Sequence, residues 1–249
     1  MKEGILKFIK DVLFPCFCAG CGKEGSFLCY DCLHKLHADK ERACPLCKSE
    51  DSSTGSVGLC EICDKCKAVS PLDGLTAFFS YKKNPTVKDI IKIFKYSFAK
   101  DAESAICALV QKGIKESGFH FKGNNLRDFH VVAVPLHPLR QRFRGFNQAE
   151  IIAVRIRDYF CKENNRSEQD FFCLRRIKNT NQQANLHKTE RSQNMKGAFV
   201  CDRPVGQRSE FNVILVDDVY TSGATMQECA RALKKAGAEI VCGVALARG

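Results

Sequence analysis

The sequence contains no run of about 20 consecutive apolar residues, the length that a membrane-spanning helix needs. Its first 14 residues also lack the pattern of a signal peptide, because Lys7, Lys10 and Asp11 interrupt the apolar residues and no small-residue cleavage site follows. The apolar spacing over residues 5–13 instead predicts a short amphipathic helix, which either packs on its own protein or lies on a membrane surface. We therefore expect a cytoplasmic protein with no transmembrane segment.

Neither wholesale disorder nor a collagen-like chain fits a hydrophobic content of 45%. The 249 residues carry a formal charge of +11, and this charge is uneven. Residues 1–75 have 10 Lys and Arg against 11 Asp and Glu, whereas residues 76–249 have 29 against 17. Ten of the 16 cysteines also lie between positions 16 and 66. These two contrasts predict a cysteine-rich N-terminal domain over 1–75 and a basic domain over 76–249.

The cysteines form successive Cys-x2-Cys pairs, a spacing that directs two sulfurs at one metal ion. Two pairs make one tetrahedral zinc site, so four pairs predict a double zinc ribbon after the N-terminal helix. A redox dithiol is the alternative for any single pair, and disulfides are disfavoured without an export signal. All ligands would be sulfurs and no position would stay open, so both zinc ions are expected to be structural. The expected ligands are Cys18, Cys21, Cys29, Cys32, Cys44, Cys47, Cys60 and Cys63.

Spacing leaves two points about the cysteines open. Neighbouring pairs can share a metal, or the pair at 18 and 21 can cross to the pair at 44 and 47. Cys63 can also pair with Cys66 instead of Cys60, and we favour Cys60 because Leu59-Cys60 repeats the form of Leu28-Cys29. Cys16 and Cys66 are then surplus.

Periodicity in the basic domain alternates between strand and helix, which predicts a parallel α/β sheet flanked by helices. Gly237 is expected to cap the last helix, and the prolines at 135 and 138 are expected to stop regular structure. The insert around 122–128 is expected to be a surface loop, and 163–170 a polar connection. The expected strands are 75–81, 130–134, 211–216 and 239–245, and the expected helices are 87–98, 102–115, 148–160 and 226–236.

The strongest chemical signal is a loop that follows the apolar run Val213–Val216. Asp217 and Asp218 come first, and a Thr/Ser/Gly loop over 221–225 then leads into a helix. Such a loop offers N–H groups, hydroxyls and a helix dipole to a phosphate, and the glycine permits close approach. The carboxylates suit ribose hydroxyls, so the segment indicates a sugar phosphate. In the plainer alternative, the acids cap a loop and Thr221 is an N-cap; a P-loop is disfavoured because no G-x-x-x-x-G-K-[ST] occurs.

A second segment, Val134–Gln148, follows another strand and holds Arg140, Arg142 and Arg144. Arginine side chains at a strand end suit the oxygens of pyrophosphate. A third stretch begins with Leu174-Arg175-Arg176 and contains Thr180, Gln183, Leu186, Arg191, Asn194, Gly197 and Phe199.

The loop after Val216 resembles the phosphoribosylpyrophosphate (PRPP) fingerprint of type I phosphoribosyltransferases. Together with the Cys-x2-Cys pairs, the Pro-Leu-His-Pro to Arg-Gly-Phe-Asn-Gln segment and the third stretch, it resembles the ComF family over roughly 14–248. That family joins a zinc ribbon to a type I phosphoribosyltransferase-like domain, here 76–249. Cys16, Cys66 and the insert at 122–128 depart from the pattern.

The resemblance implies a site for Mg²⁺ and PRPP. Asp217 and Asp218 would contact the ribose hydroxyls, and Mg²⁺ would bridge ribose and pyrophosphate oxygens. If catalysis occurs, Asp217, Asp218 and Arg140 would be the catalytic residues, with Mg²⁺ and arginines stabilising the leaving pyrophosphate. The expected binding residues are Leu136, His137, Arg140, Asp217, Asp218, Thr221, Ser222, Gly223, Ala224 and Thr225.

ComF-like proteins are linked with natural transformation, in which internalised single-stranded DNA is handled beside a helicase-like partner. A basic domain fits a polyanionic partner, and the arginines with Phe143 and Phe146 could contact a strand and its bases. A basic surface can also be only a soluble surface. Two functions remain open: a competence-type DNA-handling protein with a retained PRPP site, and an active transferase with an unidentified acceptor.

Overall fold

The computed structural model describes residues 15–39, 44, 46–47, 62–96, 101–117, 119, 129–164, 173–179, 193, 195–202 and 211–249. The predicted N-terminal helix, Cys60, the insert at 122–128 and most of the connection at 163–170 lie outside these residues. Most of the third stretch, from Thr180 to Arg191 and Asn194, lies outside them as well.

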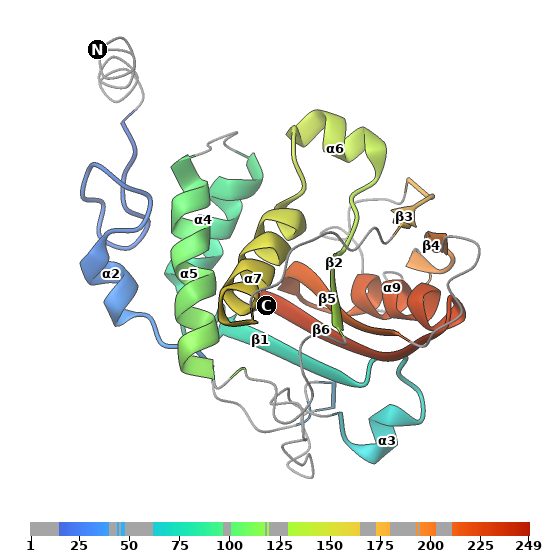
Figure 1. Cartoon of the computed structure of the whole chain (residues 1–249). Coiled ribbons are helices and arrows are strands. Elements are labelled where there is room, and N and C mark those ends of the chain that lie inside the picture. Colours follow the sequence, from blue (N-terminus) through green and yellow to red (C-terminus); the bar gives the residue numbers. More distant parts are fainter. Residues whose placement is uncertain are drawn as a thin grey trace.

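The centre of the molecule is a four-stranded sheet in the order β1-β6-β5-β2, and every neighbouring pair is parallel (Figure 1). The strands are rich in buried apolar residues, as expected for a sheet covered on both faces. This confirms the predicted α/β class. The strands are β1 (Gly74–Ser80), β2 (Phe129–Ala133), β5 (Phe211–Tyr220) and β6 (Ala238–Arg248).

Helices cover the two faces of the sheet unequally. On one face, α4 (Pro85–Tyr96), α5 (Asp101–Ser117) and α7 (Gln148–Asn164) pack in one apolar cluster with Ile214 and Val244 of the sheet. On the other face, α9 (Ala224–Lys235) packs on β5 and β6 together with a hairpin of β3 (Cys173–Arg176) and β4 (Phe199–Asp202). Each face therefore has its own core.

Two short helices carry cysteines and lie far apart. The helix α2 (Tyr30–Lys35) lies beside α5, and α3 (Asp64–Lys67) precedes β1 on the other side of the sheet (Figure 1). The proposed domain boundary at residue 75 falls inside β1, so the division at this position stays a prediction.

The sequence predicted the four strands of the sheet and the long helices to within a few residues, but it did not predict the hairpin strands β3 and β4. Three details of the predicted elements also differ. Residues 135–138 do not end regular structure, because Pro138 is the first residue of α6 (Pro138–Arg144). A helix tolerates proline there, since its first N–H groups have no intrahelical partner. The cap residue of α9 is Ala236, and Gly237 follows it with a φ of 96°. β5 also extends to Tyr220, because its pairing with β6 continues to Arg248.

Candidate functional site

Eight cysteines form two clusters of four sulfurs each. The first tetrad is Cys18, Cys21, Cys29 and Cys32, and the second tetrad is Cys44, Cys47, Cys63 and Cys66. Within each tetrad all sulfurs lie within 4.8 Å of one another. The Sγ atoms of Cys21 and Cys29 are 3.7 Å apart, and those of Cys47 and Cys63 are 3.5 Å apart. A tetrahedral Zn–S bond of about 2.3 Å places two sulfurs about 3.8 Å apart, so both tetrads fit zinc.

In each tetrad the sulfurs of two neighbouring Cys-x2-Cys pairs lie together, so the described cysteines follow the sequential pairing and not the crossed one. Cys66 completes the second tetrad in the position that the sequence analysis gave to Cys60. Cys60, which the sequence favoured as the fourth ligand, lies outside the described residues, so its role stays a prediction. Cys16 is in neither tetrad.

Within the first tetrad the thiolate is favoured at Cys18, whereas the hydrogen bond with Cys29 and burial raise the pKa of Cys32 to about 12. Burial opposes ionisation of Cys18, but hydrogen bonds from the backbone of Cys29, Gly20 and Cys21 outweigh it and lower the Cys18 pKa to about 6. The backbone N–H of Cys29 donates to Cys18 Sγ over 3.3 Å. Turns between closely spaced cysteines supply such N–H groups, so the local chain stabilises a metal-binding sulfur.

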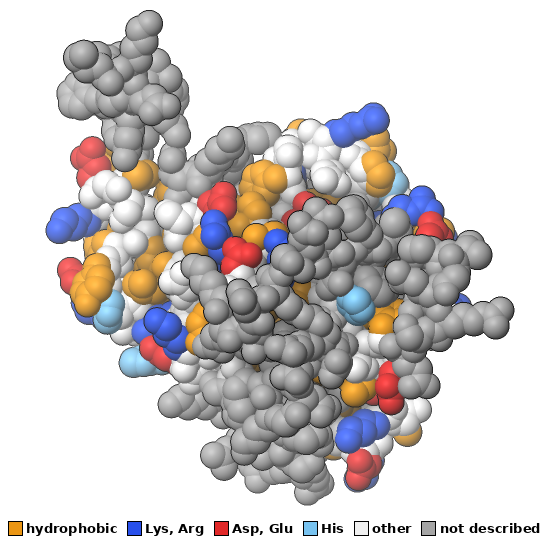
Figure 2. Space-filling model, in the orientation of Figure 1, with side chains coloured by type: hydrophobic (Ala, Val, Ile, Leu, Met, Phe, Trp, Pro, Cys, Tyr) orange, Lys and Arg blue, Asp and Glu red, His pale blue; other side chains and the backbone are white. Residues whose placement is uncertain are grey.

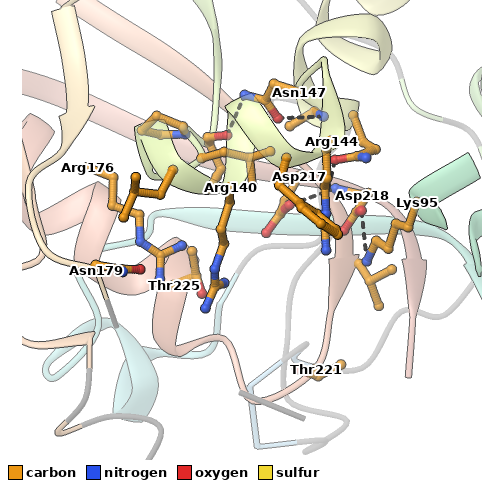
Figure 3. A pocket seen from close by; sticks show the side chains of 18 of the residues that line it. Lys95, Arg140, Arg144, Asn147, Arg176, Asn179, Asp217, Asp218, Thr221 and Thr225 are labelled. Carbon is orange, nitrogen blue, oxygen red and sulfur yellow. Dashed lines mark hydrogen bonds and ion pairs between the residues drawn. The ribbon is translucent and has the colours of Figure 1, made fainter. Parts of the chain in front are cut away.

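A cavity of about 690 Å³ opens at the carboxyl edge of the sheet (Figure 3). Its walls come from the ends of β1, β2 and β5, from α4 and α6, and from the hairpin strand β3. Ligands bind at this edge in open α/β sheets, close to the point where the strand order reverses. Here that point lies between β5 and β2. The polar side chains in the wall belong to Tyr81, Lys95, Arg140, Arg144, Asn147, Gln148, Arg176, Asn179, Asp217, Asp218, Thr221 and Thr225.

The two predicted acids line the cavity but lie in different surroundings. Both acids lie near the C-terminal end of β5. Successive side chains of a strand point to opposite faces of the sheet, so the two carboxylates point in different directions. Asp218 forms an ion pair with Lys95 of α4, with Oδ2 and Nζ 2.8 Å apart. Asp217 instead influences the pKa values of Arg176 and Cys229 on the other face. Burial and the nearby Asp218 charge raise the pKa of Asp217 to about 7, against the opposing effect of Lys95.

The phosphate loop, residues 221–225, lies between β5 and α9. Thr221 and Thr225 line the cavity, whereas Ser222, Gly223 and Ala224 are not among the described wall residues. Ser222 Oγ is 3.5 Å from the Ala224 nitrogen. Gly223 has a φ of 76°, and a Cβ added there would lie 2.7 Å from Tyr220 Cζ. Glycine is therefore required by both the left-handed backbone and the adjacent phenol ring.

The arginine segment 134–148 forms much of the opposite wall. Leu136, Arg140 and Arg144 line the cavity as expected. His137 is not among the wall residues: its Nδ1 accepts a hydrogen bond from the Leu139 N–H over 3.3 Å and caps α6. The sequence placed His137 in the binding loop, and the structure shows it starting the helix that presents Arg140.

Gln148, the first residue of α7, supplies a donor that the sequence analysis did not single out. Its side chain is 2% exposed and lines the cavity. Its Oε1 accepts from Arg144 over 3.3 Å, but Nε2 has no hydrogen-bond partner among the described residues. An unmade hydrogen bond on a buried amide is costly. This donor and the N-terminus of α7 therefore suit a ligand oxygen in the cavity.

Arg176 brings a further positive charge from the hairpin. It is 7% exposed, lies 5.5 Å from the Phe199 ring, and donates towards Met195 Sδ over 3.7 Å. Burial and the neighbouring charge of Arg140 lower its pKa to about 10. Two arginines that repel each other in a cavity wall provide a strong site for a multiply charged anion.

Lys95 and Tyr81 are wall residues that no sequence motif marked. Lys95 belongs to the amphipathic helix α4, where a lysine usually indicates only a solvated face. Burial, together with the charges of Asp218 and Asp217, raises the pKa of Tyr81 well above its usual range, so the phenol stays protonated beside the acids. Only the tertiary fold brings these residues to the acid pair.

Comparisons with known proteins agree with this geometry. The family model of the phosphoribosyl transferase domain matches residues 149–249, which include the acid pair and the phosphate loop. Competence protein F of Haemophilus influenzae is 25% identical over 232 residues, covering 90% of this chain and 97% of that protein. Competence protein ComFC of Bacillus subtilis is 28% identical over 218 residues, covering 86% and 81% respectively.

The DNA utilization protein YhgH of Escherichia coli is likewise 28% identical over 222 residues, covering 80% of this chain and 93% of that protein. The chain is a homologue of these ComF-type proteins. The ComF resemblance predicted from the motifs is thereby confirmed, and so is the phosphoribosyltransferase domain.

The cavity also fits Mg²⁺, which phosphoribosyl transferase domains commonly use. Carboxylate oxygens are ligands that Mg²⁺ prefers, and Asp217 and Asp218 both line the cavity. None of the described wall residues is a cysteine or a histidine, the side chains that would favour zinc.

Among the helices that the structure describes, none has the length and apolar character of a membrane-spanning segment.

Proposed function

We propose that the cavity binds PRPP with Mg²⁺ and that the protein acts in natural competence by handling internalised single-stranded DNA. The observation that supports the ligand best is the meeting of three groups in one cavity. The acid pair, the threonines of the phosphate loop and the arginines 140, 144 and 176 all line it. Ribose hydroxyls, a 5-phosphate and a pyrophosphate need these three kinds of partner.

Each group has a role in this proposal. Asp217 and Asp218 would accept hydrogen bonds from the ribose hydroxyls and hold Mg²⁺, which would neutralise pyrophosphate charge. Thr221 and Thr225 would bind the 5-phosphate with the first N–H groups of α9. Arg140 and Arg176 would bind pyrophosphate oxygens, and an anion between them would offset their mutual repulsion, which adds to burial in lowering the Arg176 pKa.

The proposed DNA surface is α6 beside the cavity. This helix contains Arg140, Arg142 and Arg144 and no acidic residue. Phe143 is 76% exposed and Leu139 is 55% exposed. Figure 2 shows basic and hydrophobic side chains together on this projecting part of the molecule. Exposed aromatic rings stack on unpaired bases while arginines neutralise phosphates, which is the usual way to bind single strands.

The names of the relatives support the cellular role. Two of them are called competence proteins and one a DNA utilization protein. A helicase-like competence partner remains part of the proposal. The second candidate is an active phosphoribosyltransferase, favoured by the matching domain, in which the bond from ribose C1 to pyrophosphate breaks and a bond from C1 to an acceptor forms.

The deciding experiment compares three measurements on one zinc-loaded preparation. Calorimetric titration of PRPP with Mg²⁺ should show saturable binding that Asp217→Ala/Asp218→Ala abolishes. Fluorescence anisotropy should show single-stranded DNA binding that weakens with salt and changes when PRPP is added. Unchanged PRPP binding in the double variant would refute the site.

Pyrophosphate release separates the two candidates. A screen over nucleobases, nucleotides and single-stranded DNA should show no acceptor-dependent release if the PRPP site is retained only for binding. Acceptor-dependent release that disappears in the double variant would favour the transferase instead.

A further inference from the structure

Tyr220 packs against the phosphate loop and shares a buried cluster with ligands of the second tetrad. Tyr220 is the last residue of β5 and is 6% exposed. Its ring fills the space next to Gly223, where a Cβ would lie 2.7 Å from Cζ. Tyr220 also belongs to the same buried cluster as Cys44 and Cys63. The residue that packs against the loop glycine therefore shares its core with the second tetrad.

The electrostatics of Tyr220 agree with this placement. Burial raises its pKa to about 12, a hydrogen bond with Gln227 opposes the rise, and Cys44 and Cys66 add to it. Two sulfur atoms of the second tetrad are therefore close enough to act on the phenol. Gln227 belongs to the first turn of α9, and its N–H donates to the Gly223 carbonyl over 2.9 Å.

A second connection links the same tetrad to the far end of α9. Cys66 lies in α3, and the chain then reaches β1 through Asp73. The Asp73 carboxylate accepts from the Val241 N–H over 2.7 Å and pairs with Lys234, in the last turn of α9, over 2.8 Å. The C-terminal end of the helix that follows the phosphate loop is thus joined to the segment that connects the second tetrad with β1.

The first tetrad has different neighbours and provides an internal comparison. Gly20, between its ligands, faces Thr86 of α4, whose Cγ2 is 3.4 Å from an added Cβ. The segment that follows α2 bonds to the start of α4, with the Asn84 amide donating to the His37 carbonyl over 3.1 Å. Its apolar neighbours lie in the core cluster of α4, α5 and α7. None of these contacts involves the phosphate loop.

We propose that the metal-filled second tetrad holds the phosphate loop in its binding conformation through Tyr220, a positioning residue, whereas the first tetrad stabilises only the α4–α5 face. This inference rests on the proposed function only in naming phosphate as the ligand of the loop. A metal bound by four thiolates makes the chain around Cys44 and Cys66 a rigid wall behind the ring. Without the metal the wall loosens, the ring can move away from Gly223, and the first N–H groups of α9 lose their fixed positions.

The test uses the full-length, zinc-loaded protein and a matched pair of variants, Cys47→Ser and Cys21→Ser. Both cysteines are the exposed members of their tetrads. Hydrogen–deuterium exchange is followed in peptides covering 219–227 and 85–96, together with zinc content. We expect each variant to lose one zinc, and Cys47→Ser to speed exchange at 219–227 by about tenfold or more. Cys21→Ser should speed exchange at 85–96 and leave 219–227 unchanged.

Tyr220→Leu and Tyr220→Phe then separate the ring from the metal. Tyr220→Leu should keep both zinc ions and still speed exchange at 219–227. Tyr220→Phe keeps the ring but loses the hydroxyl next to Gly223 and its bond with Gln227, so it should speed exchange less than Tyr220→Leu. The affinity for Mg²⁺ and PRPP should fall in Cys47→Ser and Tyr220→Leu by about tenfold, and not in Cys21→Ser. Equal effects of the two cysteine variants on 219–227, or none, would overturn the inference.

The two proposals can fail separately. If the wild-type protein does not bind PRPP, the proposed ligand is wrong, but the exchange data still decide whether the second tetrad holds the loop. If Cys47→Ser does not fold, Tyr220→Leu with both zinc ions bound decides it, and wild-type exchange in that variant would overturn the coupling.

Discussion

Lys95 Nζ lies 2.8 Å from Asp218 Oδ2, so a helix that bears no recognisable motif contributes a charge to the acid pair. The same ammonium group lowers the pKa of Asp217, which burial and Asp218 raise to about 7. The protonation of Asp217 near neutral pH therefore depends on α4 as well as on β5.

Replacing Lys95 should shift the pH dependence of ligand binding. A protonated Asp217 binds neither Mg²⁺ nor a hydroxyl donor well, so wild-type affinity for Mg²⁺ and PRPP should fall as the pH drops below about 7. Lys95→Met removes the charge that opposes the rise and should move this midpoint to higher pH. Calorimetry between about pH 6 and 9 measures it. Lys92→Met, an exposed lysine on the same helix, is the control, and identical profiles for all three proteins would contradict the prediction.

Asp217→Asn should stabilise the ligand-free protein at alkaline pH while abolishing PRPP binding. A carboxyl whose folded-state pKa is raised contributes stability below its unfolded pKa of about 4 and loses it as the pH rises through about 7. The gain in the free energy of unfolding should be on the order of a few kcal/mol at pH 8 and absent near pH 4. Denaturant unfolding at both pH values tests this, and a gain at pH 4 as large as that at pH 8 would contradict it.

Gly223→Ala should cost more stability than Gly145→Ala, although both glycines have a φ between 76° and 79°. A Cβ added at position 145 has no neighbouring atom within 4 Å. The left-handed backbone alone should therefore lower the free energy of unfolding of Gly145→Ala, by about 1–2 kcal/mol. At 223 the Cβ also meets the Tyr220 ring, which should bring the loss to about 3 kcal/mol or more. Thermal unfolding compares the stabilities of the two variants. Equal losses would contradict the prediction, because they would mean that the Tyr220 ring moves aside at no cost in free energy.

Phe143→Ala should weaken single-stranded DNA binding without changing stability. The ring is 76% exposed, so it contributes little to the core, and loss of stacking should cost about 1–3 kcal/mol of binding free energy. Arg142→Ala should instead reduce the slope of log affinity against log salt by about 0.7. Tyr30→Ala is a matched control, because that ring is 73% exposed on the distant α2. An equal loss with Tyr30→Ala would argue against α6 as the DNA surface.

Zinc analysis should decide between Cys60 and Cys66. The full-length protein should contain about two zinc ions per chain. Cys66→Ser should lose one of them, because Cys66 completes the second tetrad, and Cys60→Ser should keep both. Mass spectrometry of the metal-loaded proteins measures this. Loss of a zinc ion in Cys60→Ser and retention in Cys66→Ser would reverse the assignment.

The parallel sheet and the position of the acid pair could be predicted because their signals are local. A buried strand such as Val213–Val216 is a continuous apolar run, and the acids and loop follow it directly in the chain. The short helix α6 was missed because proline normally ends a helix, and its role as a first residue depends on the His137 cap. The hairpin of β3 and β4 joins segments more than 20 residues apart, which periodicity cannot connect.

The wall of the cavity could be predicted only in part. Asp217, Asp218, Thr221, Thr225, Leu136 and Arg140 line it as expected. Lys95 and Tyr81 reach it from separate elements through the packing of α4 and β1 at the carboxyl edge. Cysteine spacing likewise predicts which sulfurs can share a metal but not the face of the sheet on which each tetrad packs.

The position of the second tetrad has a consequence for the order in which the chain matures during synthesis. The neighbours of the first tetrad in α4 and α5 leave the ribosome soon after its cysteines. The second tetrad shares its apolar cluster with Tyr220 and Met226, which are translated more than 150 residues after Cys66. Proteins emerge from the ribosome N-terminus first. The second tetrad therefore lacks its contacts with this part of the apolar cluster until translation is nearly complete. We expect its zinc to become resistant to chelators last, in the same step that forms the phosphate loop.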